Sequence, residues 1–388
     1  MNSTKATSSL LKLELLSCGV DFQTQPSSIG EHYKEEYRAI FDARLQNSKN
    51  INLPPEIVLP GSIVVKTIYR ETSPYSIVES GGDFYMMRKS DYSVVCSVNF
   101  PLRPDFYRMQ TSKGTPMKQI GQILGLDCLG VIINSYCSRC STGKGCKFCN
   151  IASTTQKDRD SIRGLDEIVE TAMAAQAEGA FSLVNLTGGT FEDPGVEFET
   201  YTEVGGRLRN LLGSNRLPGV SSVNPPTADL LARHTSKLAN ANFDLLTYNL
   251  EVWDRDILRE VCPGKHDIGG RDFYIDSAIK TMGIIGEGHV GIIFTVGPWE
   301  SVESLIEGCE HLARKSILPI PVVFHPGRGA EYSYMGTTSV NNLLRLYQKV
   351  GEIYRTYGLV RDGRCRPAGS ELSFRNSLIN ETVLGHLK

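Results

Sequence analysis

The chain has 388 residues, of which 40% are hydrophobic and 22% charged, and its 41 basic and 43 acidic residues give a net charge of −2. This composition is typical of a globular protein and excludes a disordered chain, a collagen-like fibre and a small disulfide scaffold. The balanced charge predicts no nucleic-acid partner, and the lack of a run of about 18 apolar residues predicts no membrane span. Residues 1–9 are polar and lack the order of a secretory signal, so we expect a cytoplasmic protein.

The first 125 residues are predicted to form two segments. Residues 1–55 are a helical extension, in which Gly30–Gln46 alternates charged and apolar residues at helical spacing. Residues 56–125 are a small β-rich segment, because Ile57–Tyr69 and Asp83–Phe100 are rich in β-branched and aromatic residues and a Ser-Gly-Gly turn lies between them. We assign no catalytic role to the helical extension.

Six strand–helix units follow. The strand and helix of each unit are Gly130–Asn134 and Leu165–Gln176, Phe181–Leu186 and Tyr201–Leu212, Val220–Val223 and Ala228–Leu238, Leu245–Leu250 and Phe273–Ile285, Val290–Val296 and Val302–Ala313, and Pro319–Phe324 and Val340–Tyr357. Repeated units of this kind predict a parallel sheet with right-handed crossovers. Six units rather than eight predict an α/β fold with a partial (βα)6 TIM-like barrel over residues 126–330 and a helical C-terminal extension over 331–388. Chemistry in such a barrel lies at the carboxyl ends of the strands.

The segment after the first of these strands is rich in cysteine. Four of the ten cysteines lie within thirteen residues, and these are Cys137, Cys140, Cys146 and Cys149. Thiolates hold iron–sulfur clusters, and short spacings let one loop bind three irons. Lys144 and Lys147 are expected to offset the negative charge of the thiolates. A structural zinc site is the alternative because C-x2-C occurs twice, but zinc ribbons separate the two pairs by about 12–20 residues.

This cysteine segment resembles the radical S-adenosylmethionine (radical SAM) superfamily, in which a cysteine loop that ends in Cys-x-aromatic-Cys follows the first strand of a βα barrel. The usual spacing there is C-x3-C-x2-C. The nearest match here is C-x5-C-x2-C, formed by Cys140, Cys146 and Cys149, which is similar to HmdB of [Fe]-hydrogenase cofactor assembly. Cys137 is the alternative first ligand, and Cys140 is favoured because it needs the smaller loop. The resemblance implies a [4Fe–4S] cluster and S-adenosylmethionine as cofactors.

Two further strand ends resemble the biotin synthase-like branch of the superfamily. Gly188, Gly189 and Thr190 stand at the place of a GGE-like segment, with Thr190 replacing the acid, and the resemblance implies contact with the amino group of the methionine part. An ordinary turn is the alternative. Asn249 and Glu251 share a face of their strand by alternation, and the resemblance implies contact with the ribose. A salt bridge within the barrel is the alternative for this pair.

The remaining candidates follow the same resemblance. Arg271 lies twenty residues after Glu251, which implies that it binds the methionine carboxylate, and a surface arginine is the alternative. Val296 and Phe148 are implied to flank the adenine. His325 and Arg328 follow the sixth strand and are candidate substrate-binding residues, although a histidine at a strand end is more often structural.

The resemblance implies reductive cleavage of S-adenosylmethionine and removal of a hydrogen atom from a small-molecule biosynthetic substrate. It also implies an external one-electron donor such as flavodoxin or ferredoxin. Cys262 could face the substrate, but a packed cysteine is favoured. Two other classes stay open: a zinc-stabilised binding protein, and an iron–sulfur scaffold that does not cleave S-adenosylmethionine.

Overall fold

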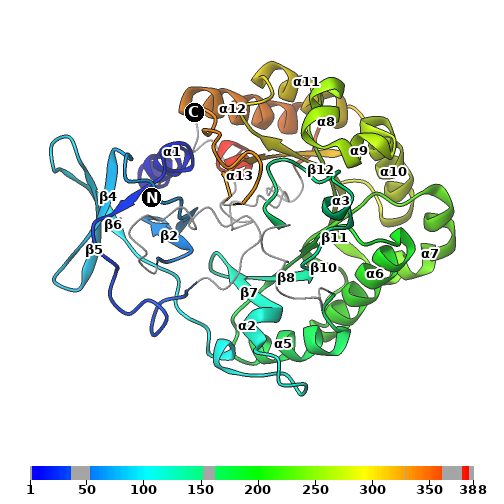
Figure 1. The fold of residues 1–388 in the computed structure, drawn as a ribbon, viewed down its shortest axis with the longest axis horizontal. Coiled ribbons are helices and arrows are strands. Elements are labelled where there is room, and N and C mark those ends of the chain that lie inside the picture. The colour runs from blue at the N-terminus through cyan, green and yellow to red at the C-terminus, as the bar shows by residue number, and fades with distance from the viewer. Residues whose placement is uncertain (1, 36–52, 152–161, 328, 361–377, 384–388) are drawn as a thin grey trace.

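The computed structural model describes residues 2–35, 53–151, 162–327, 329–360 and 378–383 (Figure 1). Its centre is a seven-stranded sheet with the order β13-β12-β11-β10-β9-β8-β7. The six parallel strands are β8 (Cys128–Asn134), β9 (Leu183–Gly188), β10 (Leu217–Val223), β11 (Phe243–Glu251), β12 (Val290–Val296) and β13 (Leu318–Val323). Their order along the sheet is their order along the chain, and the sheet does not close, so the predicted partial barrel is confirmed.

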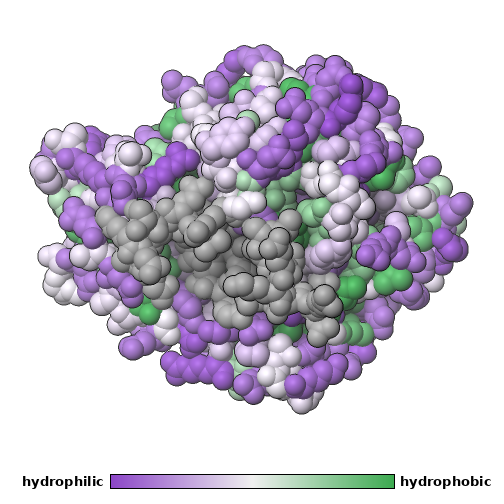
Figure 2. Space-filling view, in the orientation of Figure 1, coloured by the Kyte–Doolittle hydropathy of each residue, from purple (hydrophilic) through white to green (hydrophobic). Residues whose placement is uncertain are grey.

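Helices cover the outside of this sheet as an outer ring (Figure 1). They are α5 (Leu165–Ala177), α6 (Pro194–Leu211), α7 (Ala228–Ala241), α10 (Gly270–Ile285), α11 (Val302–Ala313) and α12 (Val340–Thr356). Side-chain caps start several of them: the Ser301 hydroxyl accepts from the backbone N–H of Ser304 at 3.2 Å, and the Asp193 carboxylate accepts from that of Gly195 at 2.7 Å. Figure 2 shows that the helices on this face expose mainly hydrophilic residues.

The strands of the barrel are buried on both faces. In β12, six of the seven residues are buried and the remaining one is half-buried, as expected of a parallel strand that is covered by helices outside and by the barrel interior inside. The predicted bounds of β12 and α11 coincide with the observed ones. The hydrophobic pattern of the sequence predicted these bounds correctly because nearly all residues of the strand are buried.

One strand of the sheet lies outside the predicted series. Strand β7 (Gly121–Leu124) pairs antiparallel with β8, with Ile123 opposite Leu129, and forms one edge of the sheet. The four-residue sequence GQIL carries too little alternation to indicate a strand by itself. Further short elements lie between the main ones, namely the 3-10 helix η2 (Asp105–Arg108), α2 (Met117–Ile120), α3 (Ser138–Ser141), α8 (Arg255–Val261) and α9 (Pro263–Asp267).

The N-terminal part adds a helix and two small sheets. Helix α1 (Asn2–Cys18) is followed by a sheet of order β1-β4-β5-β6 and by a separate hairpin of β2 and β3. The strands are β1 (Asp21–Phe22), β2 (Glu56–Leu59), β3 (Ile63–Lys66), β4 (Tyr75–Ser80), β5 (Asp83–Arg88) and β6 (Val94–Val98). The β-rich segment is thus present as predicted. The domain boundaries drawn from the sequence stay a prediction.

The helix predicted over Gly30–Gln46 is wrong in its first part. Residues 30–35 form turns, in which Gly30 has φ +87° and its N–H donates to the Tyr33 carbonyl at 2.9 Å. A left-handed glycine at this place is incompatible with a continuing helix. Residues 36–46 lie outside the described part of the chain.

The β2–β3 hairpin, hereafter the closing hairpin, covers the open side of the barrel near β7. Lys34, immediately before the undescribed stretch, forms an ion pair of 2.7 Å with Glu56 of β2. The Lys34 ammonium also donates to the carbonyls of Ile123 and Gly125, and the Gly125 N–H donates to Glu56. The hairpin is therefore joined to the β7 edge by a buried set of charged and backbone groups.

The C-terminal extension is helical as predicted within the described residues. Helix α12 packs against α11 and α1, and α13 (Leu378–Val383) packs against α12. Helices α1, α12 and α13 therefore pack together on one side of the barrel. Among the described residues, no helix has the length and apolar character needed to cross a membrane.

Candidate active site

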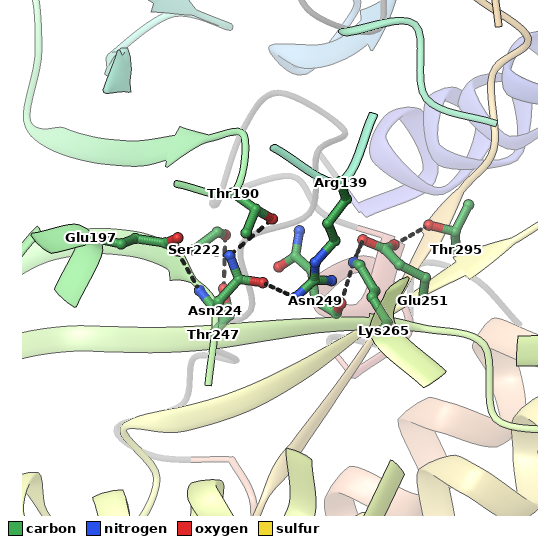
Figure 3. A network of polar contacts seen from close by, with 10 residues as sticks. All are labelled: Arg139, Thr190, Glu197, Ser222, Asn224, Thr247, Asn249, Glu251, Lys265 and Thr295. Atoms are coloured by element: carbon green, nitrogen blue, oxygen red, sulfur yellow. Dashed lines mark hydrogen bonds and ion pairs between the residues drawn. The ribbon is translucent and has the colours of Figure 1, made fainter. Parts of the chain in front are cut away.

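A cavity of about 380 Å³ lies inside the barrel and reaches the carboxyl ends of β9, β10, β11 and β13. Its volume falls in the range of small-molecule sites, which is about 300–1,000 Å³. The segment after β8 lines one part of the cavity, and the closing hairpin lines another. Figure 3 shows the polar residues that meet near the strand ends. The candidate residues of the sequence can therefore be compared with one enclosed space.

The cysteine loop, residues 137–149, is attached to three separate parts of the fold by backbone hydrogen bonds. The Ser138 N–H donates to the Thr190 carbonyl after β9 at 2.9 Å. The Lys147 N–H donates to the Val261 carbonyl at the end of α8, and the Lys147 carbonyl accepts from the Tyr332 N–H beyond β13, both at 2.9 Å. These bonds hold the loop across the carboxyl ends of the strands.

All four cysteines of this loop line the cavity. Cys137 is the residue before the one-turn helix α3, and Cys140 lies within that helix. A hydrogen bond from the Cys140 thiol lowers the pKa of Cys137, and burial raises the pKa of Cys149. The loop therefore places both candidate first ligands, Cys137 and Cys140, side by side.

Cys146 faces a different partner. The Cys262 thiol donates a hydrogen bond to Cys146, and this bond, with the nearby charges of Lys265 and Arg139, lowers the pKa of Cys146 despite its burial. Cys262 itself is fully buried and does not line the cavity, which agrees with a packed cysteine rather than with one facing a substrate. Cations therefore stabilise a thiolate at Cys146.

The cations beside the thiolates differ from those expected. The Lys144 ammonium pairs with Asp267 at 2.6 Å, and that of Lys147 pairs with Glu331 at 3.5 Å, so both have carboxylate partners of their own. Among the described residues, no three cysteine, histidine, aspartate or glutamate side chains converge as a shell for a single ion. The sulfurs share one cavity but face neighbouring thiols, as described above.

The glycine pair after β9 has a packing role. A Cβ at Gly189 would lie 1.9 Å from the Tyr136 carbonyl oxygen, and one at Gly188 would lie 2.8 Å from the Asn134 nitrogen. The Gly189 N–H also donates to the Asn134 carbonyl at 2.8 Å. Glycine is required here because the segment that leads into the cysteine loop passes directly over the end of β9. Both glycines and Thr190 line the cavity.

A network of polar contacts joins β9, β10 and the cysteine loop (Figure 3). The Asn224 amide donates to Thr190 at 3.1 Å and to Glu197 at 2.8 Å, and its oxygen accepts from Arg139 at 3.1 Å. One guanidinium nitrogen of Arg139, Nη1, is buried and has no hydrogen-bond partner, although the Tyr274 hydroxyl lies near it. Arg139 therefore lines the cavity with its guanidinium held between Asn224 and Tyr274.

Asn249 and Glu251 both line the cavity from the end of β11. Glu251 forms an ion pair of 2.8 Å with Lys265 and accepts from the Thr295 hydroxyl, so the salt bridge considered as an alternative is present (Figure 3). Lys265 also donates to the Asn249 carbonyl. Burial lowers the pKa of Lys265, but Glu251 and Cys146 outweigh it and raise the pKa above its usual value. In contrast, Oδ1 of Asn249 is buried without a partner.

Arg271 and Val296 do not line the cavity. The Arg271 guanidinium lies over the Trp253 ring, 4.5 Å from its centroid, and donates weakly to the Trp253 carbonyl at 3.4 Å. The Val296 carbonyl accepts from the Phe324 N–H at 3.1 Å and thus links β12 to the end of β13. The structure brings Arg139, rather than Arg271, to the candidate site.

An aromatic group connects the cysteine loop with β13. Phe148 stacks on Trp299 with ring centroids 5.6 Å apart, and its ring lies 6.5 Å from that of Phe324. His325 follows directly, lines the cavity, and has both ring nitrogens buried without a hydrogen-bond partner. Arg328 lies outside the described residues. Phe148 and His325 therefore belong to the same region as the cysteines.

The cavity residues that the sequence reasoning missed include Arg139, Glu197, Asn224 and Lys265. Asn224 directly follows β10, so the rule that chemistry lies at strand ends could have indicated it. Arg139 lies between two of the cysteines, and the sequence analysis of this segment considered the thiols and did not consider Arg139. Glu197 and Lys265 lie on α6 and α9, and no strand-end signal points to them.

Comparison with known proteins finds sequence similarity over the part of the chain that contains the cysteine loop and most of the strand ends. The sequence model described as Radical SAM superfamily matches residues 134–311. The bacteriochlorophyllide c C-7(1)-hydroxylase of Chlorobaculum limnaeum is 21% identical over 261 residues, which are 63% of this chain and 64% of the relative. The chain thus spans slightly less than two thirds of this curated relative.

Solved structures show weaker likeness. HydG, a maturase of the [FeFe]-hydrogenase, is 16% identical with a TM-score of 0.44, and the match covers 61% of this chain and 51% of HydG. A radical SAM methyltransferase from Sphaerobacter thermophilus is 16% identical with a TM-score of 0.42, over 81% of this chain and 78% of that structure.

Proposed function

From the premise that residues 134–311 form a domain of the radical SAM superfamily, we propose that this protein reductively cleaves S-adenosylmethionine and removes a hydrogen atom from a small-molecule substrate. Members of the superfamily bind a [4Fe–4S] cluster and S-adenosylmethionine, which are the two cofactors predicted from the sequence. The observation that carries the proposal is a single cavity that holds four cysteines of one loop together with unsatisfied polar atoms at the strand ends.

The cysteine loop supplies the donor set that suits an iron–sulfur cluster. Cys140, Cys146 and Cys149 would hold three irons, and Cys137 is the alternative to Cys140. The cluster supplies one electron to the sulfonium when S-adenosylmethionine is bound. Lys265 and Arg139 hold positive charge beside Cys146 and so favour the thiolate form that metal binding needs.

The polar groups near β9 and β11 suit the methionine and ribose parts of S-adenosylmethionine. Oδ1 of Asn249 is buried without a partner and can accept from a ligand hydroxyl or amine. Gly188 and Gly189 line the cavity, although the segment of residues 134–136 occupies the space that their side chains would need. The Arg139 guanidinium lines the cavity and can donate to a carboxylate, the role expected of Arg271 from the sequence.

The walls of the cavity position and shield a small substrate. Phe148, Trp299 and Phe324 form an aromatic group beside the cysteine loop, and their packing excludes water from that side. The curated relative is a hydroxylase by name, and superfamily relatives act on small molecules, so we assign a small biosynthetic substrate to this cavity. The electron would come from an external donor such as flavodoxin or ferredoxin.

Anaerobic reconstitution of the full chain with iron and sulfide tests the proposal. We expect absorbance near 400 nm, about four irons per chain, and 5′-deoxyadenosine after addition of S-adenosylmethionine and a reductant. Cys146→Ala and Cys149→Ala should lose the absorbance and the product. Cys309→Ala is the matched control, because Cys309 is a buried cysteine of α11 outside the cysteine loop.

Other outcomes separate the alternatives. A colourless protein with about one zinc per chain would support the zinc-stabilised binding protein. A brown protein that forms no 5′-deoxyadenosine would support an iron–sulfur scaffold. Full iron content and product formation in both alanine variants would contradict the assignment of these cysteines.

A further inference from the structure

Glu197 is a buried carboxylate whose two oxygens face N–H groups. It lies in the first part of α6 and is about 3% exposed. Oε2 accepts from the Phe191 N–H at 3.0 Å, and Oε1 accepts from the backbone N–H of Asn224 at 3.0 Å and from its side-chain amide at 2.8 Å. Burial raises the pKa of Glu197, and the N–H groups of Asn224 and Phe191 oppose this rise. Because an ionised carboxylate only accepts hydrogen bonds, Glu197 decides which groups can face it.

This carboxylate fixes the orientation of the Asn224 amide (Figure 3). The amide nitrogen donates to Glu197 at 2.8 Å and to the Thr190 hydroxyl at 3.1 Å. The amide oxygen therefore points to the Arg139 guanidinium, from which it accepts at 3.1 Å. Turned the other way, the amide would set its oxygen against a carboxylate and its nitrogen against a cation. The neighbours of Asn224 thus allow one orientation of the amide.

A second connection leads from Glu197 to the same turn of the cysteine loop. The Phe191 carbonyl accepts from the Ser138 hydroxyl at 2.9 Å, and the Thr190 carbonyl accepts from the Ser138 N–H at 2.9 Å. Ser138 directly precedes Arg139 in α3. The backbone before Arg139 and its guanidinium are therefore both attached to groups that Glu197 binds.

Such attachment matters for a long side chain that lines the cavity. Arg139 lines the cavity, and an arginine that is already held in one conformation loses less entropy when a ligand binds. A guanidinium carries five N–H donors, so Arg139 can contact Asn224 and a ligand carboxylate at the same time. Asn224 can therefore influence how a carboxylate is bound through the arginine that it holds.

We infer that Asn224, oriented by Glu197, is a positioning residue that holds the Arg139 guanidinium where it binds the carboxylate of S-adenosylmethionine. This inference rests on the proposed function, in which Arg139 donates to that carboxylate. It gives Asn224 and Glu197 a part in discriminating between ligands, although both act through the arginine.

The preference for a ligand carboxylate tests this role. Equilibrium dialysis of the iron-loaded full chain gives the affinities for S-adenosylmethionine and for decarboxylated S-adenosylmethionine, and their ratio is the preference. Asn224→Leu should reduce the preference about tenfold, because Arg139 loses the acceptor that holds it. Asn240→Leu is the matched control, since the Asn240 oxygen accepts from Arg209 at 3.3 Å and does not line the cavity. A wild-type preference in Asn224→Leu would overturn the inference.

A second variant tests the carboxylate that orients the amide. Glu197→Gln should reduce the preference about threefold, because one remaining oxygen can accept from Asn224 or from Phe191 but not from both. Glu300→Gln is the matched control. Glu300 is about 7% exposed, accepts from the N–H of Asp254 at 2.7 Å, and does not line the cavity. An equal fall in the two glutamine variants would contradict the inference.

The Arg139→Ala chain shows whether the effect passes through the arginine. Asn224→Leu should leave the preference of that chain unchanged, because the group that Asn224 positions is already absent. A further fall would contradict the positioning role. Loss of bound iron in Asn224→Leu, with the preference unchanged, would also contradict it, since Asn224 would then support the cysteine loop alone. If Asn224→Leu does not fold, Glu197→Gln is compared in the same two chains and decides the question.

The inference and the proposed function fail in different measurements. Loss of iron or of 5′-deoxyadenosine formation in the wild-type chain would contradict the proposed function. An iron-loaded wild-type chain that forms 5′-deoxyadenosine, with an Asn224→Leu variant that keeps the full preference, would leave the proposed function standing and remove only the assignment of Asn224.

Discussion

Two regions of the cavity wall differ in how completely their buried polar groups are satisfied. At the closing hairpin, the Lys34 ammonium contacts Glu56 and two backbone carbonyls, so its donors are satisfied within the protein. At the ends of β11 and β13, Oδ1 of Asn249 and both ring nitrogens of His325 are buried without partners. Satisfied buried charge is a feature of a structural contact, and unsatisfied buried polar atoms indicate a place for a ligand. The comparison thus distinguishes a structural contact from a candidate ligand site without reference to any relative.

The largest expected effect concerns the first cluster ligand. Cys140→Ser should abolish the absorbance near 400 nm and the bound iron, whereas Cys137→Ser should retain most of both, because the C-x5-C-x2-C set would remain complete. Iron content after anaerobic reconstitution and gel filtration measures this difference. The opposite pattern would assign the cluster to Cys137 and leave Cys140 as its hydrogen-bond donor.

The next effect concerns the closing hairpin. Lys34→Met should destabilise the fold by about 3–5 kcal/mol, because it leaves the Glu56 carboxylate buried without its cation. The double variant with Lys34→Met and Glu56→Leu should recover much of this loss, since no unpaired charge remains. Denaturant unfolding of the apo chains measures both. Equal stability of the single variant and the wild type would show that the pair does not seal the barrel.

A smaller effect distinguishes two arginines. Arg139→Ala should weaken binding of S-adenosylmethionine by about 10–100-fold, the range expected for loss of hydrogen bonds to a carboxylate. Arg271→Ala should change it less than threefold, because Arg271 lies over Trp253 outside the cavity. Equilibrium dialysis with iron-loaded protein gives the affinities.

Decarboxylated S-adenosylmethionine provides the control for this pair of variants. The wild-type chain should bind it more weakly than S-adenosylmethionine, and Arg139→Ala should bind both alike. If Arg139→Ala weakened both ligands equally, the arginine would support the loop through Asn224 and would not contact the carboxylate.

The smallest effect is a dependence of stability on pH. The neutral His325 has a pKa below that of an unfolded histidine, which is about 6.5. As the pH falls below 6.5, the unfolded chain gains a proton that the folded chain does not, so stability decreases. This residue contributes a loss of at most about 1.4 kcal/mol between pH 7.5 and pH 5.5. Denaturant unfolding of the wild type and of His325→Gln at both pH values measures this loss. The free energy of unfolding should depend less on pH in the variant, and an identical pH dependence would contradict a buried neutral His325.

The barrel was predictable from the sequence because its elements are buried in a regular way. Strand β12 and helix α11 have the predicted bounds, since apolar runs and capping residues mark both ends. Strand β7 was not predictable, because its four residues become a strand only by pairing with β8. The turns of residues 30–35 were missed because a helical charge pattern carried more weight than the glycine at its start.

The site was predictable where strand order decides the position of a side chain. Asn249 and Glu251 both reach the cavity from the end of β11, but the register shifts between them and Glu251 has φ +79°, so regular alternation does not account for their shared side. Arg271 was expected from a count of residues along the chain, and that count carries no information about Trp253, on which the side chain packs. Lys265 depends in the same way on the short helix α9, whose direction only the folded chain defines.

The cysteine loop is held by main-chain atoms at Thr190, Val261 and Tyr332. These main-chain hydrogen bonds do not depend on which side chains surround them. Extensive evolutionary drift at these neighbours should therefore leave the sulfurs in place, and the mouth of the cavity can acquire new selectivity one substitution at a time. For engineering, the cavity-lining side chains outside the cysteine loop are therefore the starting points for altering which molecules enter, with the metal-binding end left intact.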